Sequence, residues 1–146
     1  MKEVVSIEIA KFSPKTDRMS IKLDGVLRGM VDVGSNEWPL VSALLMLGFD
    51  SVSLVDERAC ESRFTEASLL RENPVHFDGP QPHSRGHVEL RWRWSEPLEE
   101  YRIDVWLNGV RRPESVSARR SFNTMRQILV ELGFTIGHVQ EIAQAA

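Results

Sequence analysis

The sequence has a single cysteine, Cys60, among its 146 residues. One cysteine cannot form an internal disulfide and cannot supply a Cys-rich zinc site, which is typical of proteins of a reducing cytoplasm. Cys60 lies close to Arg58 and Glu61 but has no obvious general base beside it, so we predict an inert thiol rather than a nucleophile. We therefore expect a cytoplasmic protein without a cysteine-bound cofactor.

Long hydrophobic runs are also missing. The longest apolar stretch, residues 39–49, is about half of the ~20 residues that a membrane span requires, and it contains Ser42 and Gly48. Charged residues interrupt the apolar residues of the N-terminal segment, which therefore lacks the apolar core of a signal peptide. These features predict no membrane partner and no export by a signal peptide.

The common catalytic motifs are absent. The sequence contains no phosphate-binding Gly-rich loop ending in Lys-Ser/Thr, no Gly-x-Ser-x-Gly, no His-Glu-x-x-His and no Gly-x-Gly-x-x-Gly. Nucleotide hydrolysis, serine hydrolysis, zinc proteolysis and dinucleotide chemistry thus lack their usual signatures. We predict a protein that is not an enzyme and that has no catalytic residues and no cofactor.

Three histidines keep a metal-dependent enzyme open as a third alternative. They are His76, His83 and His87, which stand in or beside a segment rich in proline and glycine. Imidazoles can bind zinc, and the spacing of His83 and His87 would suit a helix. Because a proline and a glycine in this segment disfavour a helix, we expect solvated loop histidines and no metal.

The residues that are present indicate one compact globular domain, with 42% hydrophobic and 27% charged side chains. The net charge is −3, but residues 1–84 carry 9 basic and 13 acidic side chains while residues 85–146 carry 9 and 8. The segment from Arg111 to Arg126 contains five arginines and a single acidic residue, Glu114. The second half therefore has a local excess of positive charge.

The sequence also resembles itself at a distance of about 84 residues. Met19–Arg28 aligns with Ile103–Arg112, where four of ten positions are identical and three are conservative. One inserted residue later, Leu40–Phe49 aligns with Met125–Phe134, and both segments end in Leu-Gly-Phe. We interpret the chain as a divergent duplication, and because such a pair can replace a homodimer we expect a monomer.

Each half is predicted to be an antiparallel meander followed by a helix. Apolar residues alternate as in half-buried strands, and Asp24-Gly25 and Asn108-Gly109 supply the left-handed residues of tight hairpin turns. Gly48 and Gly133 occupy the position that ends a helix. The fold class is therefore α+β, with two pseudo-repeated ββ(β)α units packed as one domain. The expected strands begin near Val5, Met19, Val26, Val88, Tyr101 and Val110. The last of them contains Pro113, so it either belongs at a sheet edge or starts late.

Three segments follow from this pattern. Residues 1–55 form the first half, which closes with a fourth strand at Ser51–Val55. Residues 56–86 connect the halves through a helix over Asp56–Glu72, which is rich in helix formers, and a Pro/Gly-rich loop. Residues 87–146 form the second half, and we expect a helix over His138–Ala145.

Strand alternation predicts an exposed basic and aromatic surface on the second half. If Val88, Leu90, Trp92 and Trp94 face the core together with Tyr101 and Ile103, the residues between them face outward. The predicted binding residues are Arg91, Arg93, Arg102, Trp106, Arg111, Arg112, Arg119 and Arg120.

Two kinds of partner suit this surface. Tryptophan and arginine are favoured anchors of protein interfaces, and they also bind nucleic acids through base stacking and phosphate contacts. A third interpretation needs no partner, because arginine stems can cover a tryptophan by cation–π contacts. We expect a non-catalytic protein-interaction module, such as an adaptor, an inhibitor or an assembly subunit, with nucleic-acid binding as the alternative.

The stretch from Asp56 to Phe134 resembles two nucleic-acid-binding designs in the order of its elements. A helix, a three-stranded meander, basic residues and a second helix resemble a double-stranded-RNA-binding domain, in which Arg119 and Arg120 take the place of lysines at the last helix. A DNA-binding domain of the integrase arm type is similar to the same degree. This resemblance implies contacts to nucleic-acid phosphates by Arg119 and Arg120.

Overall fold

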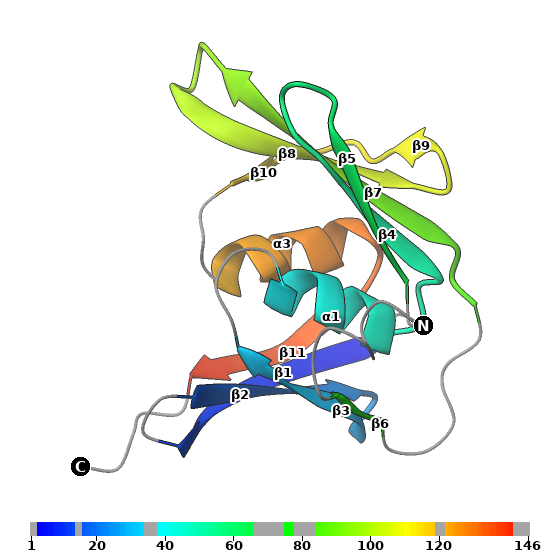
Figure 1. Cartoon of the computed structure of the whole chain (residues 1–146), viewed down its shortest axis with the longest axis vertical. Helices are drawn as coiled ribbons and strands as arrows, with labels where there is room; N and C mark the ends of the chain where they lie inside the picture. The colour runs from blue at the N-terminus through cyan, green and yellow to red at the C-terminus, as the bar shows by residue number, and fades with distance from the viewer. Residues whose placement is uncertain are drawn as a thin grey trace.

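A computed structural model describes residues 3–13, 16–33, 38–65, 75–77, 84–118 and 122–141. Within these ranges the chain is a mixed α/β protein of two β-sheets and two helices, and most of it is strand. Both helices lie between the two sheets, which gives three layers (Figure 1). The predicted α+β class is confirmed.

Sheet A is the first layer and has the strand order β11-β1-β2-β3-β6. Its centre is an antiparallel meander of three strands, to which β11 adds in parallel and β6 in antiparallel orientation. Its strands are β1 (Val4–Ser13), β2 (Thr16–Leu23), β3 (Val26–Val33), β6 (Val75–Phe77) and β11 (Thr135–Glu141).

Sheet B is the third layer and has the order β10-β8-β7-β4-β5, with β9 also paired to β8. Here β7 and β8 form a long hairpin, and β4 lies parallel to β7. Its strands are β4 (Ser51–Val55), β5 (Glu61–Thr65), β7 (His87–Ser95), β8 (Glu100–Leu107), β9 (Val110–Arg111) and β10 (Val116–Ser117).

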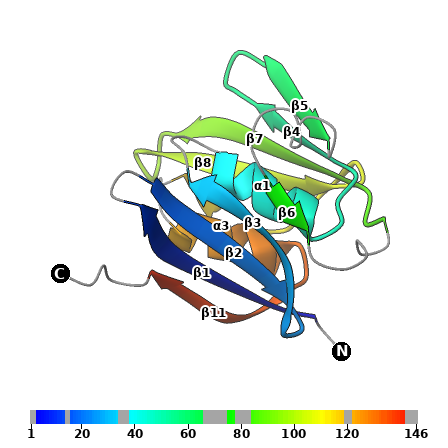
Figure 2. The same cartoon turned by 60° about the horizontal axis from the view of Figure 1, so that its bottom comes forward.

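The two sheets exchange strands between the two halves of the chain. The strand that follows the first helix, β4, pairs with β7 in the second half, and the strand that follows the second helix, β11, returns to pair with β1. Figure 2 shows β11 beside β1 although they stand at opposite ends of the sequence. Each sheet is thus completed by a strand from the other half.

The helices are α1 (Trp38–Met46) and α3 (Phe122–Glu131). Residues 40–47 are all buried, because α1 contacts β3 of sheet A on one side and β4 of sheet B on the other. A helix between two sheets needs apolar residues all round, and this explains its sequence. In α3 the stripe of Met125, Ile128 and Leu129 is buried while Val130 is exposed.

Both helices end in the same way. Gly48 and Gly133 have φ angles of 103° and 101°, and the N–H groups of Phe49 and Phe134 donate to carbonyl groups five residues earlier, at 3.3 and 3.1 Å. This is the Schellman arrangement that the sequence predicted. The rings of Phe49 and Phe134 then meet edge to face, with centroids 6.2 Å apart.

The hairpin turns of the two halves are also alike. Asp24 and Asn108 both have a φ angle of 50°, and the glycine after each has a φ angle of 81°, as a two-residue turn of this kind requires. The carboxylate of Asp24 accepts the N–H of Val4 at 2.9 Å, and the amide oxygen of Asn108 accepts the N–H of His87 at 2.8 Å. Each turn therefore also fixes the start of the strand next to it.

Two predicted helices are wrong over the part of each that the structure describes. Within Asp56–Glu72 the structure has a turn and strand β5, because pairing with β4 outweighs the helix propensity of these residues; positions 66–72 lie outside the described residues. In place of a helix over His138–Ala145, the chain continues β11 to Glu141, where Val139 pairs with Ile7; positions 142–145 are outside the described ranges.

Three further predictions need correction. Trp94 and Tyr101 were expected in the core, but they are 43% and 45% exposed. The segment predicted as loop contains β6, which pairs with β3. The return strand expected from Val110 is divided into β9 and β10, and Pro113 falls between them.

Among the described residues, neither helix combines the length and the apolar surface needed to cross a bilayer.

Candidate functional site

One face of sheet B points away from the helices, and no described element covers it (Figure 1). Strand register brings polar and charged side chains of five neighbouring strands together on this side. We call it the outer face of sheet B. Its residues are Ser51, Ser53, Glu61, Arg63, His87, Glu89, Arg91, Arg93, Glu100, Arg102, Asp104, Trp106 and Arg111.

The arginines of this face are held by carboxylates. Asp104 is bound by two of them, since its Oδ2 accepts Nε of Arg93 at 2.9 Å and its Oδ1 accepts a terminal nitrogen of Arg111 at 3.1 Å. Arg91 binds Glu89 at 2.6 Å, and Arg102 binds Glu100 at 2.9 Å. The face carries five arginines and four carboxylates, so its charges nearly balance. The field is therefore weaker than the arginines alone suggest.

Trp106 lies in this network and is partly covered by it. The guanidinium carbon of Arg91 stands 4.9 Å from the centre of the Trp106 ring, a cation–π contact. The indole Nε1 is buried and has no hydrogen-bond partner among the described residues. An indole N–H without an acceptor is costly, so Trp106 is incompletely satisfied in the isolated chain.

A second group of the same face surrounds strand β4. Ser51 and Ser53 are only 5% and 0% exposed although they point to the outer face, because longer side chains of β5 and β7 close over them. Ser51 Oγ lies 2.6 Å from Nδ1 of His87, and Ser53 Oγ donates to Glu61 at 2.5 Å. One ligand atom each of Glu61, His87 and Glu89 lies within 4.8 Å of the others.

The structure brings five of the predicted binding residues together on this face, namely Arg91, Arg93, Arg102, Trp106 and Arg111. Arg112 lies elsewhere, because its Nε donates to the carbonyl of Glu131 at the end of α3, at 2.8 Å. Its side chain therefore has a structural contact. Arg119 and Arg120 lie outside the described residues. The resemblance to double-stranded-RNA-binding domains needs a helix before the meander, and the described part of the segment predicted for it, residues 56–65, contains strand β5 instead.

Sequence reasoning missed the grouping around β4. His87 was considered with His76 and His83, but the structure places it beside Glu61 and Glu89 instead. The side chains of His76 and His83 lie outside the described ranges. Glu61 could not be found because its strand was predicted as a helix. The signal that could have found it is the alternation of Glu61, Arg63 and Thr65 opposite a strand with small residues.

An aromatic pair was also missed. Trp94 and Tyr101 stand opposite each other near the end of the β7–β8 hairpin, with ring centroids 5.0 Å apart. They project from the same side of the hairpin as Trp92. The turn end of the β7–β8 hairpin extends beyond the helices (Figure 1). A strand of nine residues extends about 30 Å, whereas a helix of ten residues covers about 15 Å. The helix layer is thus too short to bury the side chains near the turn of the β7–β8 hairpin.

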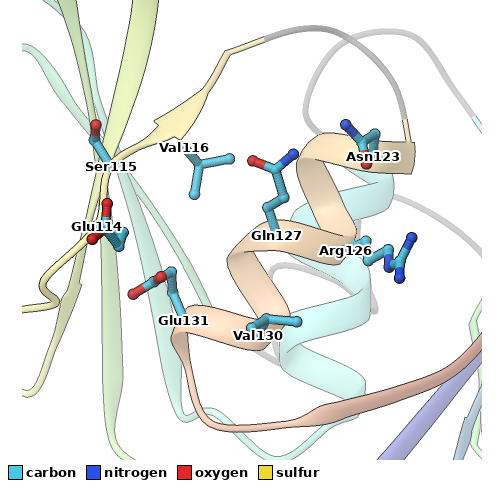
Figure 3. A pocket seen from close by; sticks show the side chains of 8 residues that line it. All are labelled: Glu114, Ser115, Val116, Asn123, Arg126, Gln127, Val130 and Glu131. Atoms are coloured by element: carbon cyan, nitrogen blue, oxygen red, sulfur yellow. The ribbon is translucent and has the colours of Figure 1, made fainter.

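An open pocket of about 480 Å³ lies between α3 and the segment that joins β9 to β10 (Figure 3). Glu114 and Glu131 point into the same space from opposite walls, while Arg126 points away. The described lining offers carboxylates and amides without a nucleophile and base in contact. The lining residues are Glu114, Ser115, Val116, Asn123, Arg126, Gln127, Val130 and Glu131.

The outer face of sheet B is therefore the candidate site, because charge, aromatic surface and a metal-ligating group meet there. The chain matches no protein-family model, no curated protein and no solved structure at a significant level.

Proposed function

We propose that the chain is a non-catalytic protein-interaction module, acting as an adaptor, an inhibitor or an assembly subunit, and that it docks its partner through the outer face of sheet B. The observation that carries this proposal is the arrangement of Arg91 over Trp106 beside the Arg93–Asp104–Arg111 network on an uncovered sheet face. Ion pairs and packing hold these side chains in place, so a partner pays little entropy to fix them.

The corresponding face of sheet A supports this assignment by contrast. Where Trp106 pairs across to Glu89, the related pair in sheet A is Lys22 and Ser6. Lysine and serine are depleted at interfaces, whereas tryptophan and arginine are enriched. The asymmetry between the two sheets favours a role for Trp106 beyond the architecture of the fold.

The charge pattern favours a protein over a nucleic acid. A phosphate-binding surface gains affinity from arginines that release counterions, but here the two carboxylates of Asp104 and Glu89 pair with Arg93, Arg111 and Arg91 and offset two of their three positive charges. A face of mixed charges instead matches a partner with both signs. Nucleic-acid binding remains the alternative, and it requires these pairs to open.

The exposed groups of the site indicate which chemical groups the partner surface offers. Arg91, Arg93 and Arg111 each leave almost half of the side chain exposed, with nitrogens free for further acceptors beyond their ion pairs. Trp106 Nε1 has no acceptor among the residues that the structure describes, but it is buried, so a docked partner meets the apolar ring rather than this nitrogen. We infer a partner surface that offers carboxylates or carbonyl groups around an apolar centre.

We also infer that the two halves descend from a duplicated unit and that the chain works as a cytoplasmic monomer. The matched turns at Asp24 and Asn108 and the matched helix ends at Gly48 and Gly133 support the duplication. The exchange of β4 and β11 supplies within one chain the contacts that two copies would otherwise share. Cys60 is a free, exposed thiol, as suits a reducing compartment.

Site-specific photo-cross-linking tests the docking proposal. A photoreactive residue at position 93 should capture one protein from an extract of the source cells, and the same residue at position 22 of sheet A should not. The captured protein, once purified, should bind the unmodified chain in a 1:1 complex. Equal capture from both positions would contradict the proposal, and a nuclease-sensitive product at position 93 would support nucleic-acid binding instead.

A further inference from the structure

Three metal-ligating side chains from two strands converge over a third strand on the outer face of sheet B. Glu61 belongs to β5, and His87 and Glu89 belong to β7, while β4 lies between these strands. One ligand atom of each lies within 4.8 Å of the others. Sheet register therefore brings Glu61 to His87 and Glu89, which stand 26 and 28 residues further along the chain.

The strand between them is built to allow this approach. β4 turns Ser51, Ser53 and Val55 outward; the small side chains of the two serines leave space above the strand beside His87 and Glu89, whereas Val55 lies opposite Glu61. Two larger residues there would hold Glu61 and His87 apart. Polar residues are unusual at buried strand positions, and here both hydroxyl groups contact the group above them.

These serines orient the ligands as an outer coordination shell does. Ser51 Oγ contacts Nδ1 of His87 at 2.6 Å, which leaves Nε2 as the nitrogen available to a ligand. Ser53 Oγ donates to Oε1 of Glu61 at 2.5 Å and leaves Oε2 available. Metal-binding histidines typically bond through their other nitrogen to a protein oxygen, and ligating carboxylates are hydrogen-bonded as well.

We propose that Glu61, His87 and Glu89 form a binding site for a divalent transition-metal ion, with Zn²⁺ as the ion best suited to one imidazole and two carboxylates. Tetrahedral Zn²⁺ with bonds of about 2.0–2.1 Å needs its ligand atoms roughly 3.4 Å apart. The exposed side chain of Glu61 can close the remaining gap by rotation. Water completes the coordination, and no sequence motif marks such a site.

One contact competes with the metal. Arg91 Nε binds Oε2 of Glu89 at 2.6 Å, so this arginine neutralises one ligand of the site. A metal ion would use the other carboxylate oxygen or displace the guanidinium. Removing the charge of Arg91 should therefore strengthen metal binding.

Calorimetric titration of the full chain with ZnCl₂, after treatment with EDTA and dialysis, tests the site. We expect one Zn²⁺ per chain, at least about 10-fold weaker binding in His87→Gln and Glu89→Gln, and tighter binding in Arg91→Gln. The matched control is His76→Ala/His83→Ala, which removes the other histidines of that segment and should bind as the parent does. Thermal unfolding in EDTA checks that each variant is folded.

Three results would overturn the proposal. They are no Zn²⁺ binding by the parent chain, unchanged affinity in folded His87→Gln, or loss of binding in His76→Ala/His83→Ala. Because none of these measurements uses a protein partner, failure of the metal site and failure of the docking proposal are separate outcomes.

Discussion

Ser51 Oγ lies 2.6 Å from Nδ1 of His87, and this contact joins the last strand of the first half, β4, to the first strand of the second, β7. The two residues are direct partners in the parallel register of these strands. The proposed metal site therefore depends on the place where the two halves meet. Both this site and the strand exchange depend on the pairing of β4 with β7.

The strand exchange predicts that the halves cannot fold separately. Residues 1–83 and 84–146, produced as two chains, should each lack cooperative unfolding, because each sheet would lose a strand that covers its core. Equimolar mixing should restore the circular dichroism of the full chain. Cooperative unfolding of either fragment alone would contradict the exchange.

Gly86 is expected to tolerate no side chain. Its φ angle is 93°, and an added Cβ would lie 1.9 Å from Oδ1 of Asn108, which is held by the N–H of His87. Gly86→Ala should lower the free energy of unfolding by more than about 2 kcal/mol, whereas Gly133→Ala, with a φ angle of 101° and open space, should cost about 1–2 kcal/mol. Urea unfolding measures both, and equal losses would disprove the close contact at Gly86.

Ser42 in α1 is expected to be replaceable by alanine. Its side chain is fully buried, and its Oγ has no hydrogen-bond partner among the described residues. Ser42→Ala should leave the free energy of unfolding unchanged or raise it by up to about 1 kcal/mol, since alanine removes a buried unsatisfied hydroxyl and favours a helix. Ser53→Ala is the control and should destabilise, because that hydroxyl binds Glu61. A clear loss of stability in Ser42→Ala would show that its hydroxyl has an acceptor.

The parts of the fold that depend on local sequence could be predicted. Asp24-Gly25, Asn108-Gly109 and the helix-ending Gly48 each act through their own φ angles and neighbours, and the structure has them as expected. Strand β5 and the end of β11 could not be predicted in this way. Glu61–Thr65 and Thr135–Glu141 become strands because edges of distant strands accept them, and that information is not local.

The candidate site could likewise be predicted from the sequence only in part. Alternation along β7 and β8 placed Arg91, Arg93 and Trp106 on one face, and the register confirms that placement. Alternation could not show that Arg112 turns to the end of α3, because the strand breaks next to Pro113. It also could not bring Glu61 to His87, which requires the order of strands in the sheet.

The affinity of the purified partner for matched variants of the chain tests most directly whether the outer face of sheet B binds a protein. Trp106→Ala should weaken binding at least about 10-fold, as expected for a central interface anchor. Arg112→Ala, which loses a contact to the end of α3, should lower stability by about 1 kcal/mol and leave the affinity unchanged. An unchanged affinity in folded Trp106→Ala would contradict the claim.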